Sequence, residues 1–134
     1  MIDYEHVLLI EEEKGQRYVL SNAFQAIERI RLSTVDDPRQ AIGVARLTSP
    51  KVVIAEIFYP NSGGYLGADF FHALRKEAPG VKLIITSTLS DENIQAEFLV
   101  KIKAQCYLNK PYDLEFLLRR CCELLDIQFP NMAQ

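Results

Sequence analysis

The chain has 134 residues, of which 49% are hydrophobic and 25% are charged, and its formal net charge is −3. This composition is typical of one globular domain with a core of its own and excludes a disordered chain. No apolar stretch approaches the length of a membrane span, the first residues lack a signal-peptide pattern, and the acidic balance disfavours nucleic acid as a direct partner. We therefore expect a cytoplasmic domain that contacts neither membrane nor nucleic acid.

Five short runs rich in apolar and β-branched residues alternate along the chain with segments of helical period. Such alternation predicts repeated β–α units around a parallel sheet. The predicted strands are His6–Ile10, Arg29–Val35, Lys51–Ile57, Val81–Ser87 and Ala104–Asn109. Three helix starts carry N-cap residues, namely Asp37 before Pro38, Ser90 before Asp91, and Asp113 before the last helix.

The composition of the predicted strands orders them in the sheet. The first, third and fourth strands are almost wholly apolar, as expected of central strands covered by helices on both faces. The second strand contains Arg31 and Ser33, and the fifth contains Gln105 and Asn109, so both should lie at edges. With right-handed crossovers this predicts a flavodoxin-like, doubly wound (βα)5 fold of the α/β class with strand order 2-1-3-4-5.

Polar side chains gather where the predicted strands end. In a doubly wound sheet the functional crevice lies outside the carboxyl ends of the strands. The residues predicted to meet there are Glu11, Glu12, Glu56, Ser87 or Thr88, and Lys110. Three carboxylates held this close require Lys110, a divalent ion such as Mg²⁺ or a raised carboxyl pKa to neutralise them.

Three segments together resemble the receiver domain of bacterial two-component response regulators. They are Val7-Leu-Leu-Ile-Glu-Glu, Glu56-Ile-Phe-Tyr-Pro60 and Lys110-Pro111-Tyr112-Asp113. The resemblance runs from about Val7 to Leu125, which places the domain at 1–126 and leaves 127–134 as a tail or the start of a linker. It implies that Glu11 and Glu12 match the metal-binding acidic pair and Glu56 the phosphoacceptor. Lys110 matches the invariant lysine, and Ser87 (or Thr88) with Tyr107 matches the pair of switch residues.

The chain departs from the family at each acidic position. Where the family carries aspartates, this chain has Glu11, Glu12 and Glu56, each longer by one methylene group. Misplacing a reacting group by about one ångström can cost on the order of a hundredfold in rate, and Mg²⁺ demands strict octahedral geometry. We expect that Glu56 is not phosphorylated, that no cofactor is required, and that Glu56 directs its charge toward Lys110. Binding of Mg²⁺ by Glu12 and Glu56 stays open.

Two segments differ from the family in length. The loop 61–67 is about three residues longer than the usual receiver loop, and the fourth helix is one residue longer, with Lys103 replacing a glycine. That helix also has too many apolar residues for one buried stripe, so some should be exposed. The predicted interaction surface comprises Ile94, Phe98, Phe116, Arg119 and Arg120.

The resulting hypothesis is an atypical receiver that acts in signal transduction by protein–protein contact and is not an enzyme. Its partner would be a signalling protein, a fused output domain or a second copy bound through the fourth helix, fifth strand and fifth helix. One alternative is a working Mg²⁺-dependent phosphoacceptor. Another is a flavodoxin-like binder of a small molecule or nucleotide, although the acidic turn after the first strand repels phosphate.

Overall fold

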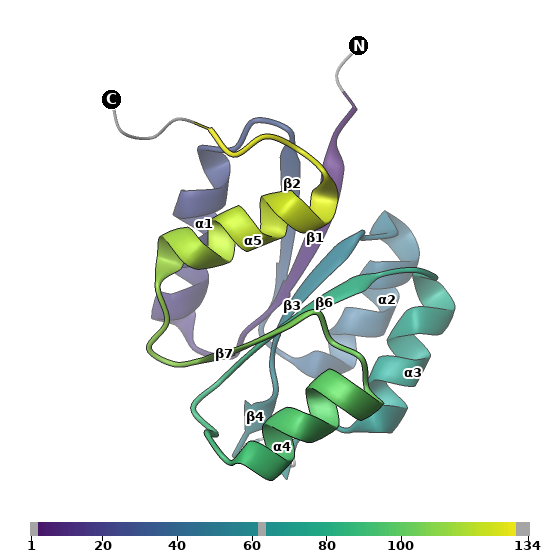
Figure 1. Cartoon of the computed structure of the whole chain (residues 1–134). Coiled ribbons are helices and arrows are strands. Elements are labelled where there is room, and N and C mark those ends of the chain that lie inside the picture. The colour runs from purple at the N-terminus through teal and green to yellow at the C-terminus, as the bar shows by residue number, and fades with distance from the viewer. Residues whose placement is uncertain (1–2, 62–63, 131–134) are drawn as a thin grey trace.

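The computed structural model describes residues 3–61 and 64–130, and these form one α/β sandwich (Figure 1). The main sheet contains β1 (Glu5–Ile10), β2 (Ile30–Val35), β3 (Val52–Glu56), β6 (Lys82–Ser87) and β7 (Cys106–Asn109). The helices are α1 (Lys14–Gln25), α2 (Pro38–Thr48), α3 (Ala68–Glu77), α4 (Glu92–Ala96) with its π-helical continuation η1 (Glu97–Lys101), and α5 (Leu114–Leu125). A short hairpin adds β4 (Phe58–Tyr59) and β5 (Gly64–Tyr65).

The main sheet is wholly parallel, with the order β2-β1-β3-β6-β7. This is the predicted order 2-1-3-4-5 once the hairpin strands are left out, so the predicted fold is confirmed. The observed strand bounds differ from the predicted ones by one or two residues. The two strands with polar residues, β2 and β7, do lie at the edges.

Helices cover both faces of the sheet, as the apolar central strands require. Figure 1 shows α1 and α5 on one face and α2, α3 and α4 on the other. The core is accordingly divided into two clusters of buried side chains, with Leu8 and Ile10 in one and Val7 and Leu9 in the other. Alternate residues of β1 therefore serve opposite faces, as the period of a strand dictates.

The predicted cap residues are confirmed at two helices and shifted at a third. Asp37 accepts a hydrogen bond from the backbone N–H of Arg39, and Asp113 accepts one from that of Glu115. At α4 the predicted cap Ser90 is wrong by one residue. Asp91 is the cap, since its carboxylate accepts a hydrogen bond from Asn93 N at 2.7 Å.

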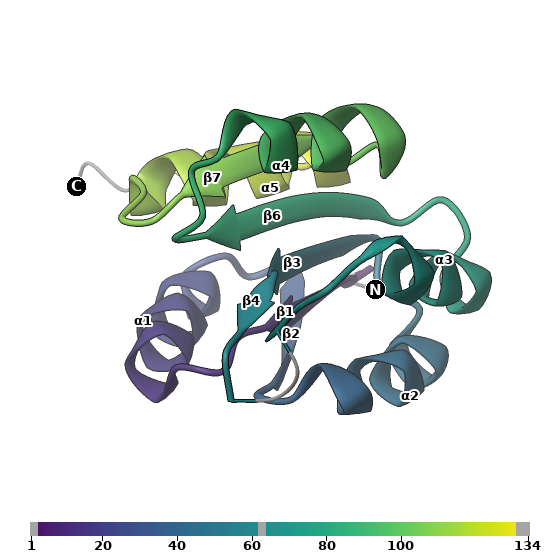
Figure 2. The ribbon, with the colours of Figure 1, turned by 90° about the horizontal axis from the view of Figure 1, so that it is seen from below.

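The long loop after β3 contains the β4–β5 hairpin, which the sequence did not predict. Its two strands pair antiparallel, Phe58 with Tyr65 and Tyr59 with Gly64. The buried Tyr59 donates its hydroxyl to Ile10 O at 3.1 Å, which fixes the hairpin against the end of β1. Residues 62 and 63 of the predicted loop lie outside the described residues. The hairpin stands beside the carboxyl-terminal ends of the strands (Figure 2).

The fourth helix accommodates its additional residue as a π-helix. In η1 the amide of Ile102 donates to Glu97 O, five residues earlier, which is how a single inserted residue is usually absorbed. Lys103 follows with φ of 63°, so it adopts the left-handed conformation that glycine would take at this helix end. The Arg75 guanidinium donates to Ile102 O and Lys103 O and stabilises this helix end.

Candidate functional site

A buried ion cluster occupies the carboxyl-terminal edge of the sheet. Glu11 follows β1, Glu56 ends β3, and Lys110 follows β7, so three parallel strands deliver their next side chains to one point. Lys110 Nζ lies 2.5 Å from Glu11 Oε1 and 3.0 Å from Glu56 Oε1. The side chains of Lys110, Glu11 and Glu56 are only 14%, 3% and 6% exposed. One ammonium thus bridges two buried carboxylates.

The remaining carboxylate oxygens are also hydrogen-bonded. Glu56 Oε2 accepts from Ile57 N at 2.6 Å and from Phe58 N at 3.0 Å. Glu11 Oε2 accepts from Glu13 N at 3.1 Å. Burial lowers the pKa of Lys110, but the hydrogen bonds to Glu11 and Glu56 outweigh it and leave the pKa above its ordinary value. Lys110 is therefore charged at neutral pH.

Glu12 does not join this cluster, so the prediction of three converging carboxylates is wrong. The half-buried Glu12 accepts a hydrogen bond from Asn61 Nδ2 at 3.3 Å. The reason is the alternation of extended backbone: successive side chains leave the chain on opposite sides, so Glu11 and Glu12 cannot both face Lys110. Two carboxylates, not three, share the ammonium.

Of the two hydroxyl residues proposed at the end of the fourth predicted strand, Ser87 is the one at the strand end. Ser87 is the last residue of β6 and is fully buried, whereas Thr88 is exposed. Ser87 Oγ accepts from Leu89 N at 3.1 Å, and the hydroxyl of Tyr107 donates to Leu89 O at 2.7 Å. Ser87 and Tyr107 therefore both form hydrogen bonds with the backbone of Leu89. Burial raises the pKa of Tyr107, and its contact with Ser87 offsets part of that rise.

Arg17 is a site residue that sequence reasoning missed. From the second turn of α1 its Nη1 donates to Glu11 O at 2.8 Å and to Glu12 O at 2.6 Å. Glu13 caps the same helix by accepting from Gly15 N and Gln16 N, and these hydrogen bonds lower the pKa of Glu13. No residue pattern marks this contact. The spacing of Glu13 and Arg17 suits an i, i+4 ion pair, yet the Arg17 guanidinium bonds the carbonyl oxygens of Glu11 and Glu12.

The predicted interaction surface needs correction on α4 and η1. Phe98 is fully buried, so its prediction as a surface residue is wrong, and Ile94 is half-buried against the core. Phe98 instead packs edge-to-face against Phe71, with ring centroids 5.7 Å apart. The exposed apolar side chains are Leu99 at 43% and Val100 at 70%. The π-helical turn changes which residues face outward, which an α-helical period cannot predict.

The predicted α5 surface residues differ from one another in their surroundings. Phe116 is 50% exposed, as predicted. Arg120 pairs with Glu123 and reaches Gln105 O beside the edge strand β7. Arg119 pairs with Glu115 and lies over the ring of Phe129, 4.3 Å from its centroid. Arg119 thus contacts Phe129 in the segment that follows α5.

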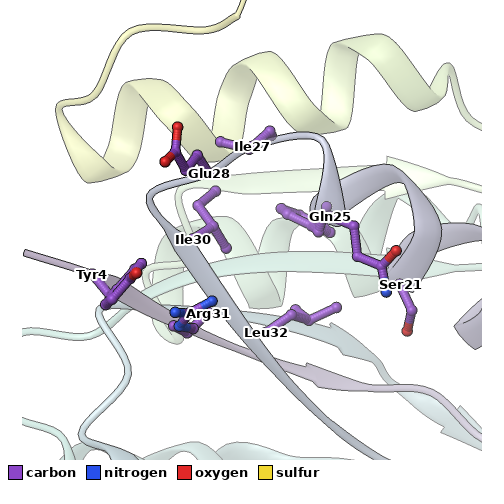
Figure 3. A pocket seen from close by; sticks show the side chains of 9 residues that line it. Tyr4, Ser21, Gln25, Ile27, Glu28, Ile30, Arg31 and Leu32 are labelled. Carbon is purple, nitrogen blue, oxygen red and sulfur yellow. The ribbon is translucent and has the colours of Figure 1, made fainter. Parts of the chain in front are cut away.

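A cavity of about 420 Å³ lies away from the ion cluster, beside the edge strand β2 (Figure 3). Its lining mixes apolar residues such as Phe24, Ile30 and Leu32 with polar ones, and the Arg31 guanidinium stacks on the Tyr4 ring. None of its lining residues belongs to the cluster of Glu11, Glu56 and Lys110. The predicted site residues therefore do not line this cavity.

Comparison with protein families identifies the class. The family model described as the response regulator receiver domain matches residues 7–121, nearly the whole chain. The chain therefore belongs to the response regulator receiver family, whose members act in two-component signalling. A curated relative, the probable transcriptional regulatory protein TcrX of Mycobacterium tuberculosis, is 27% identical over 121 residues. These residues cover 89% of this chain but 49% of TcrX, so the chain spans about half the length of that relative.

Solved structures agree on the fold. The receiver domain of the Francisella response regulator 1452 has a TM-score of 0.77 at 22% identity, covering 91% of this chain and 97% of that one. The chemotaxis protein CheY4 of Vibrio cholerae has a TM-score of 0.76 at 21% identity, covering 90% and 98%. At these identities the likeness establishes the architecture alone. No helix in the described part of the chain is long and apolar enough to span a bilayer.

Receiver domains typically bind Mg²⁺ at the phosphorylation site, which makes the donor set of this chain informative. Among residues 3–61 and 64–130, no group of three or more His, Cys, Asp or Glu side chains could hold a metal ion. The proposed ligands Glu12 and Glu56 are separately engaged, Glu12 by Asn61 and Glu56 by Lys110 and two backbone amides. The arrangement therefore does not fit Mg²⁺.

Proposed function

We propose that this chain is an atypical receiver domain that transmits signals by protein–protein contact without phosphorylation at Glu56. The observation that carries the proposal is the bridge from Lys110 to Glu11 and Glu56, with each carboxylate also bonded to backbone N–H groups. We assign no catalytic residue and no enzymatic activity to the domain. Ser87 and Tyr107 keep the hydroxyl and aromatic chemistry of the family's switch pair.

The geometry argues against attack by Glu56 on a phosphoryl donor. A carboxylate nucleophile needs an oxygen free to approach phosphorus in line, together with a cation that neutralises the donor. Glu56 Oε1 contacts the ammonium of Lys110, and Glu56 Oε2 accepts two short hydrogen bonds from Ile57 and Phe58. Attack would require one of these buried contacts to break. The longer side chain of glutamate allows it to reach Lys110 without any phosphate between them.

The partner-binding surface we propose is the apolar face, defined by Leu99 and Val100 of η1 and Phe116 of α5. Figure 1 shows α4 and α5 on either side of the edge strand β7. These three side chains are 43%, 70% and 50% exposed. Arg120, at the same edge, supplies a polar rim, and aromatic and arginine side chains are enriched at protein interfaces. The face suits a signalling partner, a fused output domain or a second copy of this chain.

The proposed domain spans residues 1–126, and the described part of the segment that follows, residues 127–130, contacts the domain. Ile127 N donates to Cys122 O at 3.0 Å, and Ile127 and Phe129 pack against the core cluster beneath α1 and α5. TcrX is named as a transcriptional regulatory protein of about twice this length. We accordingly propose that a fused output domain would follow this segment in a cytoplasmic protein.

Intact-mass spectrometry after incubation with acetyl phosphate and Mg²⁺ tests the proposal directly. We expect no phosphoryl adduct on the wild-type chain. The Glu56→Asp variant, which restores the family's acceptor, shows whether the rest of the machinery is functional. An adduct on wild type that is lost in Glu56→Gln would overturn the proposal and establish a working receiver with an unusual acceptor.

The proposed surface has a separate test in solution. Sedimentation velocity of wild type and Phe116→Glu, at several protein concentrations, measures self-association through the apolar face. A dimer in wild type that Phe116→Glu dissolves identifies a second copy as the occupant. A wild-type monomer leaves a different protein or an output domain as the partner and rejects the homodimer. The control is Leu47→Glu, because the side chain of Leu47 in α2 is exposed and lies outside the apolar face. Phe58→Glu would be a poor control, because Phe58 is half-buried in the hairpin.

A further inference from the structure

The turn between β1 and α1 carries three consecutive glutamates, and each is engaged by a different part of the protein. Glu11 bonds Lys110, Glu12 bonds Asn61, and Glu13 caps α1 through Gly15 N and Gln16 N. Like charges this close repel one another and would drive the turn open. The structure must therefore hold the turn closed against its own charge.

Arg17 supplies the contact that closes the turn. Its Nη1 donates to two consecutive carbonyl oxygens, Glu11 O and Glu12 O, and its own amide donates to Glu13 O. The guanidinium is half-buried and lies between the backbone of the turn and the first part of α1. Charge-assisted hydrogen bonds of this kind are about twice as strong as neutral ones.

Arg17 and Lys110 bring two cations to the site in different ways. Lys110 pairs with the buried carboxylates of Glu11 and Glu56, whereas the partly buried Arg17 bonds the backbone of the same turn. The cations also cover both kinds of oxygen that a hard divalent ion would use. Lys110 contacts the carboxylates and Arg17 contacts the backbone carbonyls of the same turn.

We propose that Arg17 is a positioning residue that, with Lys110, takes the place of a divalent cation and makes the closed state of this turn independent of metal. This inference rests on the proposed function, because it explains how the site remains in one state without phosphate. It adds regulation to that function: the state of the turn is set by an arginine of α1 and is insensitive to Mg²⁺. Whatever displaces Arg17 would open the acidic turn.

The test uses the full chain and compares wild type, Arg17→Ala, Arg17→Lys and a control, Arg39→Ala. Arg39 is matched to Arg17 because it also lies in the first two turns of a helix and pairs with a nearby acidic segment, Asp37, but on the surface. Two quantities are measured with and without millimolar MgCl₂. They are the midpoint of thermal unfolding and the hydrogen-exchange rate of the Glu13 amide, which donates to Glu11 Oε2.

We expect the midpoint of wild type and of Arg39→Ala to be the same with and without MgCl₂. Arg17→Ala should exchange the Glu13 amide about tenfold faster than wild type, because its bond to Glu11 Oε2 breaks when the turn opens locally. MgCl₂ should raise its unfolding midpoint, because the substitution frees the carbonyl oxygens of Glu11 and Glu12, which Arg17 occupies in wild type, and an ion that binds only the folded state stabilises that state. Arg17→Lys should restore the insensitivity to MgCl₂ because it returns a cation to the turn.

Two results would overturn the inference. One is stabilisation of wild type by MgCl₂, and the other is an Arg17→Ala variant whose exchange rates and response to MgCl₂ equal those of wild type. A merely structural role for Arg17 would lower the midpoint without creating a response to Mg²⁺. Failure of the proposed function is recognised separately, since it gives a phosphoryl adduct on wild type, whereas metal response and exchange report on Arg17 alone.

Discussion

The edge of the sheet that carries Glu11, Glu56 and Lys110 contrasts with the apolar face of Leu99, Val100 and Phe116. At the edge, buried charges are paired with one another and with backbone amides. On the apolar face, large hydrophobic side chains remain in solvent. The charged groups of the first region are paired inside the protein, whereas the apolar side chains of the second are exposed. We infer from this difference that the apolar face, and not the ion cluster, is available for contacts with other molecules.

Breaking the ion cluster should have the largest effect. Lys110→Met leaves Glu11 and Glu56 buried without their shared counter-ion, and removing one partner of a buried ion pair costs about 3–5 kcal/mol. Urea denaturation monitored by circular dichroism measures the loss in the free energy of unfolding. Lys76→Met, at an exposed lysine of α3, is the control and should change stability by about 0.5 kcal/mol or less. A loss below about 1 kcal/mol for Lys110→Met would contradict the buried bridge.

The two phenylalanines Phe98 and Phe116 provide a matched pair that sharpens the contrast between core and surface. Phe98→Ala removes a fully buried ring packed between Phe71 and Tyr107 and should cost about 3–5 kcal/mol of unfolding free energy. Phe116→Ala removes a half-exposed ring and should cost about 1 kcal/mol or less while weakening partner binding. Equal losses in denaturation would show that the described burial of Phe98 is wrong.

Stability should fall at alkaline pH. Burial lowers the pKa of Lys110, yet its hydrogen bonds to Glu11 and Glu56 leave that pKa raised in the folded state. A raised pKa contributes stability fully below the unfolded value of about 10.4 and loses it as pH rises through the folded value. Burial also raises the pKa of Tyr112 to about 12, with the same sign.

Urea denaturation at several pH values from neutral to about 11 checks this prediction. The free energy of unfolding should stay level up to about pH 8 and then decline, because burial also raises the pKa values of Cys106, Cys121 and Cys122 above the unfolded value of about 8.5. Lys110→Met should decline less steeply than wild type, because only the buried tyrosines and cysteines then contribute. An equal decline in both proteins would show that Lys110 gains no proton affinity from its two carboxylates.

The smallest effect is expected for the segment after α5. Phe129→Ala removes the stacking contact with Arg119, and exposed cation–π contacts contribute about 0.5–1 kcal/mol. Arg119→Lys should cost less than Arg119→Ala, because lysine keeps the charge over the ring. Hydrogen exchange at Ile127 should quicken in Phe129→Ala, which would show that the contact docks this segment. Unchanged exchange would mean that Ile127 holds the segment without Phe129.

Several features were predictable from residue patterns because the responsible interactions are local or periodic. The apolar runs around Val7, Val53 and Ile84 predict central strands, and Asp37 and Asp113 predict helix starts, since each pattern states which groups must be buried or capped. The strand order followed from the polar residues of β2 and β7. Glu11, Glu56 and Lys110 could be placed together because parallel strands deliver their ends to one edge.

Other features depended on geometry that no residue pattern encodes. Three examples depend on the local backbone conformation. They are the position of Glu12 outside the ion cluster, the burial of Phe98 and the contact of Arg17. Glu12 lies in the extended segment after β1, Phe98 lies in the π-helical turn η1, and Arg17 lies near the start of α1. A shift of one residue in such a segment turns a side chain from solvent into the core, so these positions could not be predicted in advance.

By itself, the sequence determined the α/β class, the strand order and the meeting of Glu11 and Glu56 at Lys110, because burial of apolar strands and the connection rules leave few alternatives. Only the tertiary structure decided which oxygens the ammonium bridges and that Arg17 closes the acidic turn. It also decided that Leu99 and Val100, not Phe98, face solvent. Hydrogen bonds and ion pairs act over a few ångströms, so their partners are fixed only when the packed backbone brings distant residues together.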